Sequence, residues 1–133
     1  NEKEKVIAAV HAGRAGVFKN IIKNTVEIFE SKYHSDLKNI KVTIGPSAQH
    51  CCYEVGKQTV KYLDFVRNNY GEEYIHGMNI DLLAIIQKQL LDLGILKENI
   101  SISEICTMCD DEKYFSFRRG DLEDRFAGVI AIK

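Results

Sequence analysis

Hydrophobic residues recur at three- and four-residue spacing in several stretches of the chain, which predicts about three amphipathic helices. The first covers Val17–Tyr33, with Lys, Asn and Glu side chains on the opposite face. The second follows the sequence CCYEVG and runs to about Arg67. The third begins after Asp81, a residue type that caps helix N-termini, and ends before Gly94, which suits a left-handed C-terminal cap.

Short β-like segments lie before, between and after these helices. Lys5–Ala12 is a continuous apolar run, which predicts a strand buried on both faces. Apolar and polar residues alternate in Asn39–Gly45, which predicts a half-buried strand. Further strands are predicted at Ile100–Ile105, Tyr114–Phe117 and Gly128–Ile132. This order of elements predicts an α+β fold, with mixed β-sheet layers flanked by about three helices.

Length and charge narrow the functional classes. A chain of 133 residues, 45% of them hydrophobic and 28% charged, is enough for one globular domain and not for two. The formal charge of −1 argues against a basic surface for nucleic acid. No apolar run approaches the roughly 18 residues of a membrane helix, and the first residues lack the apolar stretch of a signal peptide. We therefore expect a soluble, cytoplasmic protein that binds neither nucleic acid nor membranes.

His11 ends the first predicted strand and is followed by flexible glycine-containing backbone. Strand ends open onto clefts, so a histidine there is well placed as a metal ligand or general base. On spacing alone, a core histidine satisfied by a backbone partner fits better. A metal site needs at least three protein ligands, and no second histidine lies nearby in the sequence.

The four cysteines form an adjacent pair, Cys51 and Cys52, and a C-x-x-C pair, Cys106 and Cys109. Two C-x-x-C pairs would argue strongly for structural zinc, whereas one pair plus adjacent cysteines does not. A thioredoxin-like C-x-x-C pair should open a helix, and this one precedes acidic residues and a predicted strand. We therefore expect four buried, reduced and unreactive thiols.

Arginines gather near the end of the chain. Arg118 and Arg119 follow a predicted strand, and Arg125 comes soon after them. Clustered guanidinium groups can bind phosphate or carboxylate in a bidentate manner. Ion pairing with the neighbouring acidic residues, such as Asp121, is an equally good interpretation on composition. The arginines are thus candidates for an anion site or for local structure.

Several segments in this order and spacing carry a resemblance to a known family: VIAAVHAG, IGPS with CCYEVG, ICTMC, and FSFRR with a later arginine. Nearly end to end, they closely resemble the laccase-domain or polyphenol oxidase family, whose members are also called YfiH-like. The resemblance implies a YfiH-like sandwich of mixed β-sheet layers. The family is regarded as zinc-dependent purine nucleoside enzymes, so the resemblance implies a purine nucleoside phosphorylase with adenosine deaminase activity. Its substrates would be phosphate and adenosine, inosine or methylthioadenosine.

The same resemblance implies that His11 is a catalytic zinc ligand. In the family, two histidines and one cysteine hold the metal, and the other two ligands belong to segments upstream of Asn1. Residues 1–133 would then be the C-terminal part of a single laccase-like domain. We expect this part to associate with an N-terminal half or to form a homo-oligomer. With His11 alone, zinc should bind weakly and catalysis should be absent.

For the substrate, the resemblance implies that phosphate or nucleoside is bound by Arg14, Arg118, Arg119 and Arg125. The sequence departs from the family at two of these positions. The family usually has His-Ala-Gly-Trp-Arg-Gly, where this chain has an arginine directly after Gly13 and no tryptophan. It usually has Thr-Gly-Arg, where this chain has Glu-Asp before Arg125. Both departures concern the substrate pocket rather than the fold.

Two hypotheses compete with the nucleoside enzyme. The older family name implies a copper-dependent polyphenol oxidase, although no His-Cys-His cluster of the blue-copper kind is evident in the sequence. Alternatively, the chain is a catalytically inactive fragment that acts as a structural or interaction module. Phosphate-dependent release of free purine, tested beside copper-dependent oxidation, separates the enzymes.

Overall fold

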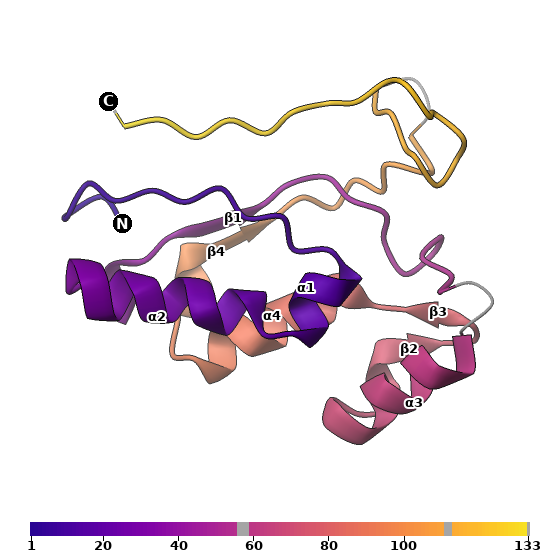
Figure 1. Cartoon of the computed structure of the whole chain (residues 1–133), viewed down its shortest axis with the longest axis horizontal. Coiled ribbons are helices and arrows are strands. Elements are labelled where there is room, and N and C mark those ends of the chain that lie inside the picture. The colour runs from indigo at the N-terminus through magenta and orange to yellow at the C-terminus, as the bar shows by residue number, and fades with distance from the viewer. Residues whose placement is uncertain (56–58, 111–112, 133) are drawn as a thin grey trace. The chain divides into compact units, whose positions relative to one another are not determined.

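The computed structural model describes the whole chain except residues 56–58, 111–112 and 133 (Figure 1). The described residues form two compact units. The first unit combines Asn1–Gly45, Ile86–Ile102 and Ala127–Lys133, and the second combines Pro46–Ile85 and Ser103–Phe126. Each unit is built from segments that are distant in the sequence, so its core depends on long-range contacts.

The first unit contains a parallel pair of strands. Strand β1 (Val42–Ile44) pairs with β4 (Ile100–Ile102), with Val42 opposite Ile100. A 3₁₀ turn precedes each strand, at Leu37–Asn39 and Lys97–Asn99. Because these strands are parallel, the chain segments that follow them leave from the same end of the pair (Figure 1).

Two helices precede this pair in the same unit. Helix α1 covers Arg14–Phe18 and α2 covers Ile21–Tyr33. The apolar face of α2 is buried through Val26 and its neighbours one turn away on either side. The sequence predicts one continuous helix over Val17–Tyr33, but Asn20 adopts φ 60° and separates the two. Asparagine tolerates this left-handed conformation better than most residues, which explains the break.

Helix α4 (Leu82–Asp92) begins and ends as the sequence predicts. The Asp81 Oδ1 atom accepts a hydrogen bond from the Ala84 backbone N–H at 2.9 Å, which satisfies an otherwise unpaired donor of the first turn. After the last turn, Gly94 has φ +93°, a value that favours glycine.

The second unit holds α3 (Thr59–Asn69) and a short hairpin. The predicted helix ending near Arg67 is confirmed from Thr59 onward, while residues 56–58 lie outside the described part. The hairpin pairs β2 (Ile75–His76) with β3 (Asn79–Ile80). Its turn includes Gly77 at φ +63°. Strands this short carry almost no periodicity, so the sequence did not predict them.

Three predicted strands are wrong. Lys5–Ala12, Tyr114–Phe117 and Gly128–Ile132 pair with no other strand among the described residues. Instead of being buried on both faces, the first segment leaves Val10 41% exposed, and in the last segment Val129 is 90% exposed. A strand forms only when a neighbouring strand takes its backbone hydrogen bonds, and an apolar composition cannot supply that neighbour.

The predicted α+β class with a mixed set of strand pairs is confirmed, since parallel and antiparallel pairs occur beside helices. No helix within the described ranges is both long enough and apolar enough to span a lipid bilayer.

The hydrogen bond of Asp81 at the start of α4 predicts a loss of stability when this side chain is removed. Asp81→Ala should lower the free energy of unfolding by about 1 kcal/mol, because the first turn loses its hydrogen-bond acceptor. Urea unfolding followed by circular dichroism measures the loss. Asp81→Asn keeps a side-chain oxygen at the cap and should cost far less. Equal destabilisation by both variants would contradict this role of Asp81.

Candidate functional site

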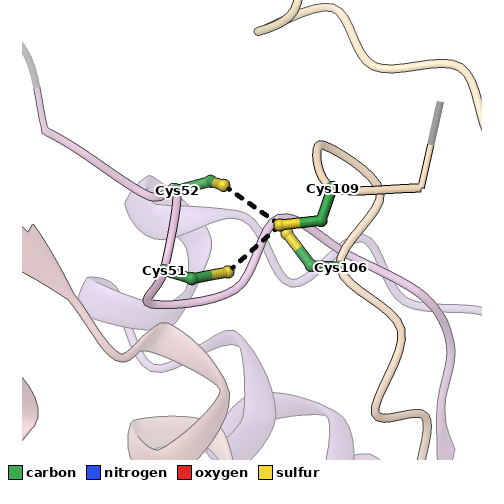
Figure 2. A group of neighbouring side chains, drawn as sticks. All are labelled: Cys51, Cys52, Cys106 and Cys109. Atoms are coloured by element: carbon green, nitrogen blue, oxygen red, sulfur yellow. Dashed lines mark hydrogen bonds between the residues drawn. The ribbon is translucent and has the colours of Figure 1, made fainter.

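Four cysteine side chains converge in the second unit (Figure 2). Cys51 and Cys52 lie in a turn that comes after β1 in the sequence. Cys106 and Cys109 lie in, or directly before, a turn that comes after β4. The two pairs approach from separate loops and point toward one another.

Backbone hydrogen bonds hold the two loops together. Ser47 forms a parallel bridge with Cys106, in which the Ser47 N–H donates to the Ile105 carbonyl at 3.4 Å and the Thr107 N–H donates to the Ser47 carbonyl at 3.1 Å. The Gln49 N–H donates to the Cys106 sulfur at 3.4 Å. The loops are therefore fixed to each other beside the cysteines by contacts that do not depend on the other three thiols.

The sulfur atoms lie at contact distance without being bonded. The Cys109 sulfur is 3.6 Å from that of Cys51 and 3.4 Å from that of Cys52. All four sulfurs lie within 4.8 Å of one another. A disulfide would require about 2.05 Å, so all four are free thiols.

The thiols differ strongly in acidity. Cys51 is exposed as a residue, but its sulfur points into the cluster, and the partial desolvation of that atom raises its pKa to about 12, with a further rise from the neighbouring cysteines. Burial also opposes ionisation of Cys106, but backbone N–H groups of Gln49, Met108 and Cys109 donate to its sulfur and bring its pKa down to about 6. A negative charge on Cys106 would in turn disfavour ionisation of Cys51.

The sequence-based interpretation of these cysteines needs correction. Burial was expected for all four, yet only Cys106 is buried, Cys52 is half-buried, and Cys51 and Cys109 are exposed. An adjacent pair does not match the usual zinc spacing, so residue spacing alone concealed the cluster. One feature of the sequence could have indicated the cluster, since each cysteine pair follows a predicted strand. If two such strands are parallel neighbours, the loops that follow them lie at the same edge of the sheet.

His11 lies in the first unit, in the loop before α1, and it is exposed. It lines a groove of about 520 Å³ together with apolar residues of the preceding segment and of α2. A Cβ atom at Gly13 would lie 2.8 Å from the His11 Nε2 atom, so a larger residue there would shift the imidazole ring. Within the described ranges, the cysteine cluster is the one group of three or more candidate ligands. His11 therefore does not complete a metal site with the described residues.

Arg119 is held by three acceptors. Its guanidinium donates to the Thr107 carbonyl at 2.9 Å, to the Tyr114 carbonyl at 2.7 Å and to the Asp121 carboxylate at 2.6 Å. The Ser116 N–H also donates to Asp121 at 2.7 Å, and this bond, together with Arg119, keeps the pKa of that carboxyl below its usual range. The ion pairing that composition suggested is thus present at Arg119.

The other candidate arginines have different surroundings. Arg118 is exposed, donates to the Glu54 carbonyl and lies 4.7 Å from the centre of the Tyr53 ring. Arg125 is exposed and donates to backbone carbonyls of its own turn. Arg14 is the half-buried first residue of α1 in the first unit. Arg118, Arg119 and Arg125 all belong to the second unit.

A second polar group surrounds the α4 cap. The His50 Nδ1 atom is 3.5 Å, and the His76 Nε2 atom 3.9 Å, from the Asp81 carboxylate. The two imidazole rings lie 4.8 Å apart. Sequence reasoning gave His50 no role, because the hairpin that carries His76 was not predicted.

Comparison with known proteins assigns the family. The family model described as multi-copper polyphenol oxidoreductase laccase matches residues 1–133. The chain belongs to this family. The resemblance seen in the sequence motifs is thereby confirmed.

Two bacterial relatives of this laccase family carry a common name. A protein of Campylobacter jejuni named purine nucleoside phosphorylase is 35% identical over 129 residues, which is 96% of this chain and 54% of the relative. A purine nucleoside phosphorylase of Clostridium acetobutylicum is 32% identical over 120 residues, 90% of this chain and 50% of the relative. The chain thus spans about half the length of these curated relatives.

Solved structures agree with the laccase family assignment. YlmD from Geobacillus stearothermophilus matches with a TM-score of 0.70 and 30% identity over 83% of this chain. The YfiH protein of Bacillus licheniformis matches with a TM-score of 0.74 and 26% identity over the same share. In both comparisons, 43% of the solved chain is covered. The fold of this chain is therefore a YfiH-type fold, as the motifs implied.

The three acceptors bound by Arg119 indicate that this residue stabilises the folded state, and the free energy of unfolding measures that effect. Arg119→Lys should lower the free energy of unfolding by about 1–3 kcal/mol, because a lysine cannot reach all three acceptors in a planar fork. Urea unfolding of both proteins at one pH gives the difference. Arg125→Lys, with an exposed guanidinium, is the matched control and should change stability little. Equal effects of the two substitutions would contradict the structural role.

Proposed function

We propose that the natural protein containing this chain is a purine nucleoside phosphorylase. It would convert adenosine, inosine or methylthioadenosine and phosphate to the free base and the sugar 1-phosphate. The observation that carries the proposal is the family match over residues 1–133, together with relatives of that name at 35% and 32% identity. Adenosine deaminase activity and a catalytic zinc ion are finer parts of the same proposal, supported by the motif resemblance.

Phosphorolysis makes two demands on the protein. Phosphate must be held so that its oxygen attacks the C1′ carbon of the sugar as the bond to the purine nitrogen breaks. Positive charge then develops on the sugar and negative charge on the departing base, so the protein must stabilise both. Guanidinium groups meet the first demand, since their planar N–H donors match phosphate oxygens.

Among the candidate arginines, Arg118 fits a phosphate-binding role best. It is exposed, its guanidinium is steadied by the Glu54 carbonyl and the Tyr53 ring, and it has five N–H donors. The guanidinium group of Arg119 already donates hydrogen bonds to protein acceptors, so Arg119 would stabilise the turn beside Arg118. Arg14 and Arg125 remain proposed substrate contacts.

His11 is proposed as this chain's contribution to the catalytic metal site. The resemblance supports the role, and the absence of a side chain at Gly13 leaves room for the imidazole ring. Because the described residues offer His11 no companion ligands, no step of the reaction is assigned to a metal. The 133-residue chain alone is accordingly expected to be inactive.

The His11 role is tested in the full-length natural protein. His11→Ala should lower kcat/KM for phosphate-dependent release of purine from inosine at least about 100-fold, by analogy with the loss of groups that support metal sites. His34→Ala, at the exposed end of α2, is the matched control and should leave the rate unchanged. Full activity of His11→Ala would contradict the proposed role of His11 as a metal ligand.

The Arg118 role makes a different prediction. Arg118→Ala should raise the KM for phosphate about 10- to 100-fold, the effect of losing a charged hydrogen bond, with a smaller change in the KM for nucleoside. Arg67→Ala, which removes an exposed arginine paired with Glu72, should change neither constant. Initial rates at varied phosphate and fixed inosine provide the measurement. A change confined to the nucleoside constant would show that Arg118 does not bind phosphate.

Assays on one preparation of the full-length natural protein distinguish phosphorolysis from deamination and from copper-dependent oxidation. Copper-dependent oxidation of phenols is the activity that the family description names. A blue-copper site uses two histidines and one cysteine, whereas the clustered donors in the described ranges are all sulfur. Purine release that needs phosphate supports the proposal, ammonia release from adenosine supports the deaminase part, and phenol oxidation on adding copper, without purine release, overturns it.

A further inference from the structure

We propose that Cys51, Cys52, Cys106 and Cys109 together bind one zinc ion that cross-links the two loops carrying them. The site lies within the second unit, and His11 is no part of it. The proposal is independent of the proposed nucleoside chemistry. It assigns a structural metal rather than a catalytic one, because all four coordination positions are taken by the protein.

The spacing of the sulfurs fits a single tetrahedral ion. Zinc–thiolate bonds of about 2.3 Å place the sulfurs of a regular tetrahedron about 3.8 Å apart. Cys109 already lies 3.6 Å from Cys51 and 3.4 Å from Cys52, sulfur to sulfur, and the whole set lies within 4.8 Å. The sulfur–sulfur distances would have to change by at most about 1 Å to reach the tetrahedron.

Four thiolate ligands favour some metal ions over others. Four thiolates in a tetrahedron are typical of zinc or of iron–sulfur clusters, and hard ions such as magnesium or calcium prefer oxygen. An iron–sulfur cluster distributes its four cysteines over two or four irons bridged by inorganic sulfide, so cysteine sulfurs on different irons lie farther apart than the sulfurs of this compact set. Among single divalent ions competing for thiolates, zinc binds more tightly than iron.

Adjacent cysteines can both reach the same ion here because of their turn. The backbone N–H groups of Cys52 and Tyr53 both donate to the Gln49 carbonyl, at 2.9 Å and 2.8 Å. This curl directs the Cys51 and Cys52 side chains to the same side, where both approach Cys109 (Figure 2). In an extended strand, successive side chains would point to opposite faces.

Surrounding groups prepare the site for negative charge. The Gln49 N–H points at the Cys106 sulfur, which stabilises a thiolate there. The Arg119 guanidinium binds the carbonyl of Thr107, between the two cysteines of the second pair. Arg118 lies against the ring of Tyr53, the residue after Cys52. Four thiolates and one zinc ion carry a net charge of −2, which Arg118 would partly offset, whereas Asp121 already balances the charge of Arg119.

A zinc ion at this site would supply a long-range cross-link, which the short strands of the second unit do not provide. The two loops are far apart in the sequence, and the backbone bridge between Ser47 and Cys106 is a small contact. Metal binding to free thiols is coupled to folding, because the ligands come together only in the folded state. The zinc ion would therefore lock the turn that Arg119 binds.

The test uses the full-length natural protein, purified without chelator and analysed for zinc and iron per chain. The variant Cys106→Ser with Cys109→Ser should contain one zinc ion per chain fewer than the unmodified protein. Met108→Ser, in the same turn but without a thiolate, is the matched control and should keep its zinc. His11→Ala should also keep this ion, which separates the cluster from the proposed catalytic site.

Two further measurements guard against a variant that fails to fold. Cys109→His offers a different zinc ligand at the exposed corner of the cluster and should retain the ion. Unmodified protein reconstituted with cobalt should show the absorption bands of a tetrahedral four-thiolate cobalt site. Equal zinc in the double Cys variant and the unmodified protein, iron in place of zinc, or cobalt bands without thiolate character would each overturn the proposal.

Discussion

The backbone bridge between Ser47 and Cys106 is the contact on which the second unit's chemistry depends. It joins two loops from distant parts of the sequence through hydrogen bonds of 3.1 Å and 3.4 Å. The Gln49 N–H reinforces it by donating to the Cys106 sulfur at 3.4 Å. With it, four sulfurs share a space less than 5 Å across. The turn bound by Arg119 through Thr107 is attached to the same bridge.

The sequence predicted best where structure depends on neighbours along the chain. The periodicity of α2, the Asp81 cap and the left-handed Gly94 are local features, and each is present. Lys5–Ala12 shows the opposite case, because an apolar segment becomes a buried strand only beside a partner strand. The β2–β3 hairpin was missed because two-residue strands leave no pattern to detect.

The candidate site was only partly accessible from the sequence. Motif resemblance assigned the family and singled out His11 and the arginines. It could not show that Arg119 is occupied by three protein acceptors while Arg118 remains exposed. It also could not show the sulfur cluster, because ligand spacing along the chain carries no information about loops joined by a bridge. The clearest chemical constellation of the chain thus comes from tertiary structure.

In the proposed site, four thiolates of this chain surround one zinc ion. X-ray absorption at the zinc edge of the full-length His11→Ala protein tests it most directly, because the proposed catalytic ligand is then removed. We expect four sulfur neighbours at about 2.3 Å from zinc. A first shell of nitrogen and oxygen, or a protein that retains no zinc, would contradict it.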